Sequence, residues 1–172
     1  MALRSTLLAL IVTSAALLAS PVAAHAGCPG AGQASSQLSP GQAQDAIRCL
    51  INRDRDRRGK KKLRQRNSLE AAAQFHANDM AVNGYFSHNA PDGSSSFDRA
   101  VAFGYLDGKG DGGVGEVIGG GDPGFTPAAA VGEWMSSGLH RRVVLARSFR
   151  HIGVGMGYVN GDVLYSVDFG HR

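Results

Sequence analysis

The stretch IGVGMGYVNGDVLYSVDFG, residues 152–170, decides how this chain folds. Apolar side chains recur at every second position on both sides of Asn160-Gly161. They are Ile152, Val154, Met156 and Tyr158 before the pair, and Val163, Tyr165, Val167 and Phe169 after it. A period of two is typical of a strand with a buried face, and Asn-Gly is a preferred link between antiparallel strands. The stretch therefore predicts a β-hairpin.

Helical patterns precede the hairpin. Ser39-Pro40 and Thr126-Pro127 each combine an N-cap residue with a proline at the first helical position. The first pair opens a helix to about residue 57, and the second opens a helix that weakens at Gly138. Further helices are predicted over about 67–83 and 96–103. With a short strand over 114–118, this gives an α+β domain with about four helices and about three largely antiparallel strands. The glycine-rich stretches 108–110 and 119–121 are predicted to be loops.

The first 26 residues have the pattern of a secretory signal. Arg4 supplies a positive charge, residues 7–18 are apolar, and Ala24-His25-Ala26 fits a cleavage site. The apolar stretch is shorter than the ~20 residues of a membrane-spanning helix, and no later segment comes close. We therefore expect a secreted chain with no transmembrane segment. It would have a signal peptide over 1–26, a flexible tether over 27–38, too small and polar to pack, and a folded domain over 39–172.

Two cysteines, Cys28 and Cys49, follow the signal. In an exported protein, an even number of cysteines favours a disulfide. The alternative is a lipoprotein, in which Cys28 is acylated after cleavage at Gly27. That signal normally has leucine three residues before the cysteine, where this chain has His25. The sequence therefore favours the disulfide and leaves the lipoprotein as its competitor.

A basic run extends from Arg53 to Arg66, with nine lysines and arginines against Asp54 and Asp56. Such a run can attract an anionic polymer or membrane surface, or it can simply be a solvated helix end and loop. No aromatic residue lies within the run, which argues against a specific nucleic-acid interface. The expected partner of the run is therefore an anionic surface, held weakly and in a salt-sensitive way.

Common catalytic motifs are absent, including the G-x-S-x-G elbow, phosphate-binding loops, H-E-x-x-H and C-x-x-C. The remaining candidates are His88, Glu116, Ser137 and His140. Two imidazoles and a carboxylate suit Zn²⁺ or a similar divalent cation, and they also suit acid–base chemistry. His76 falls on the apolar face of its helix, where we expect a hydrogen-bonded core imidazole.

Several short motifs occur in a recognisable order between about residues 43 and 170. They are Asn78-Asp79-Met80-Ala81, Tyr85-Phe86-Ser87-His88, Arg99, Gly115-Glu116, Trp134-Met135-Ser136-Ser137, His140-Arg141, Ile152-Gly153-Val154-Gly155 and Asp168-Phe169-Gly170. In this order they resemble bacterial members of the CAP superfamily, or SCP domain. That superfamily includes cysteine-rich secretory proteins, plant pathogenesis-related proteins and venom allergens.

The resemblance implies an α-β-α sandwich and a cleft lined by two histidines and two acidic residues. By position, the histidines are His88 and His140 and the first acid is Glu116. The second acid is replaced by Ser137, as is common in bacterial relatives. Glu133 could take over that role only if its helix is regular and its side chain faces the cleft.

Two functions follow as expectations. The first is a secreted binding module whose cleft holds a small apolar or cell-envelope ligand, with a divalent metal optional, since CAP relatives include sterol- and fatty-acid-binding members. The second is a metal-assisted, protease-like hydrolase with Zn²⁺ on His88 and His140 and with Glu116 as the base. The missing second acid favours binding over hydrolysis, and the sequence leaves open whether the protein is an enzyme.

Overall fold

A computed structural model describes residues 27–172, and the predicted signal peptide, 1–26, lies outside these residues. The described residues contain five α-helices: α1 (Pro40–Asp56), α2 (Asn67–Asn83), α3 (Ser96–Ala102), α4 (Pro127–Ser136) and α5 (Gly138–Val144). A 3₁₀ turn, η1 (Ser35–Gln37), precedes them. The strands are β1 (Arg64–Gln65), β2 (Gly113–Gly121), β3 (His151–Val159) and β4 (Asp162–His171). The class is α+β, as predicted.

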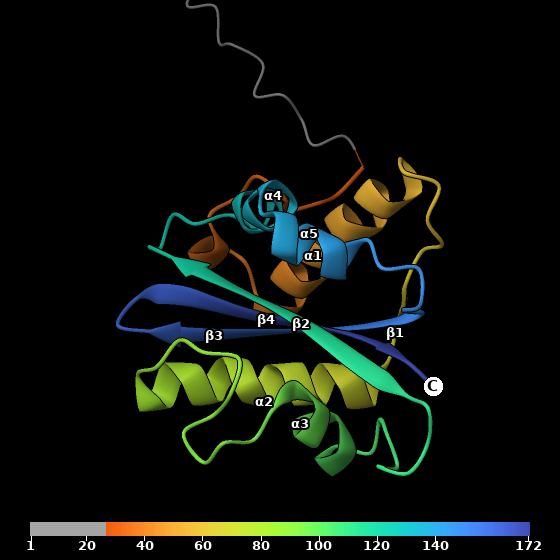
Figure 1. Ribbon diagram of the computed structural model, residues 1–172. Coiled ribbons are helices and arrows are strands. Elements are labelled where there is room, and N and C mark those ends of the chain that lie inside the picture. The colour runs from red at the N-terminus through yellow and green to blue at the C-terminus, as the bar shows by residue number, and fades with distance from the viewer. Residues whose placement is uncertain (1–26) are drawn as a thin grey trace, which may run out of the picture.

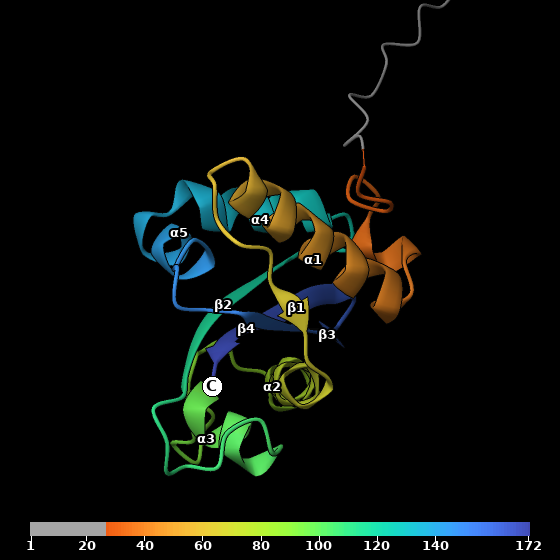
Figure 2. The same cartoon turned by 90° about the vertical axis from the view of Figure 1, so that its right-hand side faces the viewer.

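The elements form three layers, with the sheet in the middle (Figure 1). Helices α1, α4 and α5 cover one face, and α2 and α3 cover the other, as the turned view also shows (Figure 2). The strand order is β1-β3-β4-β2, with β1 parallel to β3 and the other pairs antiparallel. The α-β-α sandwich implied by the resemblance is therefore confirmed, and β2 is an edge strand.

The predicted hairpin is confirmed as strands β3 and β4. Val159 pairs with Asp162, so Asn160-Gly161 forms the whole turn. Both turn residues have positive φ angles, 50° for Asn160 and 94° for Gly161, as the preferred two-residue hairpin turn requires.

A row of glycines on β3 lets α2 pack directly against the strand backbone. A Cβ atom at Gly153, Gly155 or Gly157 would lie only 2.2–2.4 Å from main-chain atoms of α2. Contacts that short do not occur, so any larger residue would push the helix away from the sheet. The intervening residues, Ile152, Val154 and Met156, point to the opposite face and enter the main hydrophobic core.

The helix and strand counts differ from the prediction for local reasons. Ser137 leaves the helical conformation (ψ 123°), which divides the predicted fourth helix into α4 and α5. Strand β1 has only two exposed residues and lies inside the basic run, so it shows no alternation. The prediction of a loop over 119–121 is wrong, because these glycines belong to β2. A Cβ at Gly119 would lie 3.0 Å from the ring of Trp134, which explains the small residue there.

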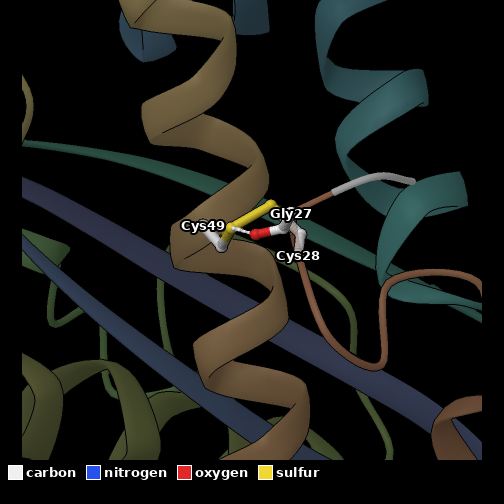
Figure 3. The surroundings of a disulfide bond; sticks show 3 residues. All are labelled: Gly27, Cys28 and Cys49. Carbon is white, nitrogen blue, oxygen red and sulfur yellow. Dashed lines mark hydrogen bonds between the residues drawn. A yellow bond between two sulfur atoms is a disulfide. The ribbon is translucent and has the colours of Figure 1, made fainter. Parts of the chain in front are cut away.

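The segment 27–38 is not the flexible tether that its composition predicted. Ala31 and Leu38 are buried, and the hydroxyl of the fully buried Ser35 lies 2.6 Å from that of Tyr165. The predicted disulfide is confirmed: Cys28 and Cys49 are bonded, with Cα atoms 5.6 Å apart (Figure 3). The bond occupies the sulfur atom that the lipoprotein alternative would acylate. Small residues pack here because the disulfide and the Ser35 contact hold them on α1 and the sheet.

Within residues 27–172, no helix is both long enough and apolar enough to cross a membrane.

Candidate functional site

Glu116 is the centre of a buried polar cluster beside the edge strand β2. Its Oε1 atom lies 2.7 Å from Nδ1 of His88, and its Oε2 atom accepts a hydrogen bond of 2.7 Å from Nη2 of Arg99. The Ser166 hydroxyl donates a further bond of 3.1 Å to Oε2. Only 2% of the Glu116 side chain is exposed. Three donors therefore occupy both carboxylate oxygens.

This environment keeps Glu116 ionised. Burial by itself raises the pKa of Glu116, but the hydrogen bond from His88 and the charge of Arg99 outweigh it. The net result is a pKa below the ordinary value for a glutamate. A carboxylate of this kind is a weak base and a strong hydrogen-bond acceptor.

The two ring nitrogens of His88 have different surroundings. Nδ1 is engaged by Glu116, while 52% of the side chain is exposed. The hydrogen bond to Glu116 raises the pKa of His88 above its ordinary value, against desolvation, which lowers it. Because Nδ1 is engaged, Nε2 is the ring nitrogen that can meet a ligand. Glu116 thus orients the imidazole.

His76 of α2 lies beneath this pair and is completely buried. Its Nε2 donates to the backbone carbonyl of Ser87 at 2.9 Å and lies 3.8 Å from Oε2 of Glu116. Desolvation lowers the pKa of His76, even though the charge of Glu116 raises it, so the neutral imidazole is favoured. The prediction of a hydrogen-bonded core histidine is confirmed, and the bond to Ser87 also fixes the loop that carries His88.

Asp168 is a further carboxyl group in this cluster. It is fully buried, and neither of its oxygen atoms has a hydrogen-bond partner within the described chain. Burial raises the pKa of Asp168 well above its ordinary value, and the neighbouring charge of Glu116 raises it further. Sequence reasoning assigned no role to Asp168 or Ser166. A signal existed, because these two polar residues alternate with apolar ones along β4.

His140 and Ser137 lie in the layer on the other side of the sheet. A Cβ at Gly115 would point at Val143 of α5, and side chains alternate along a strand, so Glu116 points away from α5. Ser137 is the N-cap of α5, and its hydroxyl accepts a 3.5 Å bond from the backbone N–H of His140. The two histidines are therefore separated by β2. Within residues 27–172, no hydrogen bond or ion pair joins His140 to His88 or Glu116.

Glu133 does not supply the missing acid. The regular helix that this would require ends at Ser136, and Glu133 is exposed on α4. The part of the chain that the structure describes contains no group of three or more His, Cys, Asp or Glu residues placed to hold a metal ion. The donors that remain for a divalent cation are Nε2 of His88 and the ring of His140.

Comparison with known proteins identifies this arrangement. A sequence profile of the cysteine-rich secretory protein family (CAP) matches residues 49–169, more than two thirds of the chain. The chain belongs to the CAP family. The match spans α2, β2 and most of the β3–β4 hairpin, so the elements that hold His88, Glu116 and His140 are all part of the CAP domain.

The relatives of this CAP domain include bacterial proteins. The uncharacterized protein YkwD of Bacillus subtilis is 34% identical over 120 residues, which is 70% of this chain and 44% of that protein. The chain thus spans less than half the length of this curated relative. An extracellular protein of Bacillus anthracis with an SCP domain is 27% identical, with a TM-score of 0.63 over 78% of this chain and 44% of that one. An outer surface protein of Borrelia burgdorferi, 18% identical, shares the fold with a TM-score of 0.64 over 73% of this chain and 90% of that one.

Proposed function

We propose that this CAP-domain protein is a secreted binding module that holds a small apolar or cell-envelope ligand beside His88 and His140 at the edge of β2. The observation that carries the proposal is the occupied carboxylate of Glu116. Arg99, His88 and Ser166 all donate to it, and the side chain is almost completely buried. Such a group positions His88 but has no free oxygen with which to deprotonate a water molecule.

The hydrolase alternative requires Glu116 to act as a general base. An effective base has a pKa near the working pH and lies within hydrogen-bond reach of the proton that it removes. The pKa of Glu116 is instead below its ordinary value, and its lone pairs face Arg99, His88 and Ser166. Both features favour binding over hydrolysis.

Exposed apolar side chains close in sequence to both histidines support an apolar ligand. Phe86 precedes His88 by two residues and is 56% exposed. Leu139 immediately precedes His140 and is 69% exposed. An apolar ligand that crosses the edge of β2 would cover both side chains and remove their surface from water.

A divalent cation, with Zn²⁺ as the expected ion, is an optional part of the proposal. His88 would bind it through Nε2, because Glu116 holds Nδ1, and His140 would be the second protein ligand. A carboxylate that orients a metal-binding histidine through its other nitrogen is a common arrangement, and the Glu116–His88 pair has it. Bound there, the cation would supply a positive charge that draws a ligand carboxylate or carbonyl oxygen to the two histidines.

Export is also part of the proposal. The pattern over residues 1–26 is that of a signal peptide, and disulfides such as Cys28–Cys49 persist in oxidising compartments. The Bacillus anthracis and Borrelia burgdorferi proteins of the same fold are described as extracellular and outer surface proteins. An intact mass of the chain recovered from culture medium would show whether residues 1–26 are removed.

Titration with a fluorescent long-chain fatty acid tests the binding site. Phe86→Ser and Leu139→Ser should each weaken binding by about tenfold, because burying such a side chain contributes roughly 1.5–3 kcal/mol. Val82→Ser is the matched control, since Val82 is 83% exposed on α2 and is expected to lie outside the site. The apolar site would be contradicted if the wild type does not bind the probe, or if Val82→Ser weakens binding as much as the other two.

The metal and hydrolase parts have their own measurements. Calorimetric Zn²⁺ titration should show binding that is lost in His88→Ala and in His140→Ala. If neither substitution weakens Zn²⁺ binding, the two-histidine site is wrong. Metal-dependent turnover of a peptide or ester substrate that disappears in Glu116→Gln would instead support the hydrolase.

A further inference from the structure

A basic hollow lies beside the C-terminal end of α1. The connection from α1 to β1 runs beside the connection from α5 to β3 (Figures 1 and 2). Between these connections is a hollow of about 230 Å³, lined by Gly59, Lys60, Lys61, Arg147 and Arg150. Four cationic residues from two distant parts of the sequence therefore surround one small space.

These cations have no acidic partners. In the described chain, no carboxylate lies within 4.0 Å of the charged nitrogens of Lys60, Lys61, Arg147 or Arg150. Like charges held together without counter-charges repel one another, and an anion relieves this repulsion. The positive potential in the hollow therefore favours the binding of a negatively charged group.

A buried arginine holds the two walls together. Arg55 of α1 is completely buried, and its Nε donates to the carbonyl of Lys61 at 2.9 Å. Its Nη1 donates to the carbonyls of Val144 at 2.6 Å and Ala146 at 3.1 Å. One guanidinium therefore fixes the loop that carries Lys61 and the loop that carries Arg147. The backbone positions of the two loops that carry the four cations are therefore built into the fold.

Arg55 itself lacks a counter-charge. Its hydrogen bonds go to carbonyl groups only, and its Nη2 atom is buried with no partner within the described residues. Burial, and after it the charge of Arg150, lowers the pKa of Arg55. A buried cation without a carboxylate is costly, so an anion just beyond the Lys61 and Arg147 walls would stabilise Arg55 as well.

We propose that this hollow binds a phosphate group of a linear polyphosphorylated polymer that carries no nucleobases. The hollow is smaller than the ~300–1,000 Å³ of typical small-molecule pockets, so it suits one compact anionic group. Guanidinium and ammonium groups are the usual donors to phosphate oxygens. The exposed Lys62 and Arg64 continue the positive charge along the chain beyond the hollow, so neighbouring phosphates of a polymer would also find cations.

The surroundings favour a phosphate polymer without bases over a lipid surface or a nucleic acid. Proteins that bind membrane surfaces usually combine cations with exposed apolar side chains. The large exposed apolar residues of the described chain are Phe75, Val82, Phe86, Phe97, Phe103, Leu139 and Tyr158, and none of them lies in the two connections that form the hollow. No exposed aromatic residue is available there for base stacking either.

Binding of fluorescently labelled inorganic polyphosphate to the protein tests this site. Lys61→Glu and Arg147→Glu change exposed side chains and should each weaken binding by about tenfold or more. Each should also reduce the slope of log affinity against log salt by about one or two, as expected when phosphate contacts are lost. Lys109→Glu makes the same change of net charge on the connection between α3 and β2, in the opposite layer (Figure 1), and should weaken binding less than about threefold.

Two further arms identify the ligand. Orthophosphate should compete with polyphosphate in the wild type and in Lys109→Glu, but much less in Arg147→Glu. Vesicles of phosphatidylglycerol and phosphatidylcholine should bind more weakly than polyphosphate at the same concentration of phosphate groups. The site would be overturned if the wild type does not bind polyphosphate, or if Lys109→Glu weakens binding as much as Lys61→Glu and Arg147→Glu do. Tighter binding to the vesicles would overturn the choice of a polymer and indicate a lipid surface.

Discussion

Glu116 lies directly opposite Asp168 in the β2–β4 ladder, so two carboxyl groups share one buried face of the sheet. Arg99, His88 and Ser166 all hydrogen-bond to Glu116, while Asp168 has no partner in the described chain. The two groups therefore differ in ionisation: the pKa of Glu116 is lowered and that of Asp168 is raised. Neighbouring carboxyls commonly separate in this way when only one of them has cationic partners.

Asp168→Asn should stabilise the protein increasingly as the pH rises. Folding raises the pKa of Asp168, so the contribution of this group to stability is present below about 3.9, the ordinary aspartate value. That contribution is lost as the pH rises toward the folded-state pKa, by about 1.4 kcal/mol for each unit of the shift. Asparagine does not titrate and escapes this loss. Urea unfolding of both proteins from about pH 4 to about pH 8 measures the difference.

Asp162→Asn provides the control for this experiment. Asp162 is exposed at the start of the same strand. Its substitution should change the free energy of unfolding little at any pH in this range. A pH-independent difference between wild type and Asp168→Asn would contradict the raised pKa.

Glu116→Gln should lower the pKa of His88. The hydrogen bond to the ionised Glu116 is the main reason that this pKa is raised, and an amide carries no charge. We expect the His88 pKa to fall toward the ordinary histidine value, as measured by NMR titration of the ring protons with a chelator present. Glu133→Gln, on the exposed face of α4, should leave the titration of His88 unchanged. An unchanged pKa in Glu116→Gln would mean that Glu116 does not orient the imidazole.

Gly155→Ala should destabilise the fold strongly. The added Cβ would lie 2.2 Å from the carbonyl oxygen of Ala73, so α2 would have to move away from β3. We expect a loss of about 3 kcal/mol or more in the free energy of unfolding, the upper end of overpacking effects. Gly132→Ala is the matched control, because a Cβ there meets nothing within 4 Å and lies inside α4. That variant should gain up to about 1 kcal/mol from helix propensity, and equal effects of the two substitutions would refute the close packing.

Removal of the disulfide should cost about 3 kcal/mol of stability, according to the loop-entropy estimate for residues 21 apart. Cys28→Ala/Cys49→Ala and the reduced wild type should unfold at similar urea concentrations, both lower than that of the oxidised wild type. Thermolysin should also cleave the segment 27–38 faster in the double variant, because Cys28 no longer holds it on α1. Equal stability of the oxidised wild type and the double variant would show that Ser35 and Leu38 secure this segment without the bond.

Local chemistry was sufficient to predict most elements. Ser39 caps α1 as its sequence indicates, Gly84 ends α2 in the left-handed conformation, and Asn160-Gly161 forms the hairpin turn. Two of the elements that were missed, β1 and α5, have weak local signals. Strand β1 is two exposed residues long, and α5 begins one residue after α4 has ended.

The site was less predictable, because its partners come from separate elements. The resemblance indicated His88 and Glu116, and the structure joins them. Arg99 is a charged residue on a short helix, which sequence alone would place on the surface, yet it is 3% exposed and bound to Glu116. Arg55 likewise belongs to the basic run, whose composition predicts a solvated surface, yet the Arg55 side chain is buried. Only the folded chain brings Arg147 next to Lys61.

The glycine row on β3 has a consequence for how the family can diverge. The distance between α2 and the sheet is set by main-chain atoms in contact, so it does not depend on which apolar side chains fill the larger core on the opposite face. His76 is carried by α2, and Glu116 belongs to the same sheet as β3. Substitutions around Ile47, which belongs to that larger core, should therefore leave the spacing between α2 and β3 unchanged. The distance between α2 and β3 and the filling of the larger core are thus set by different residues.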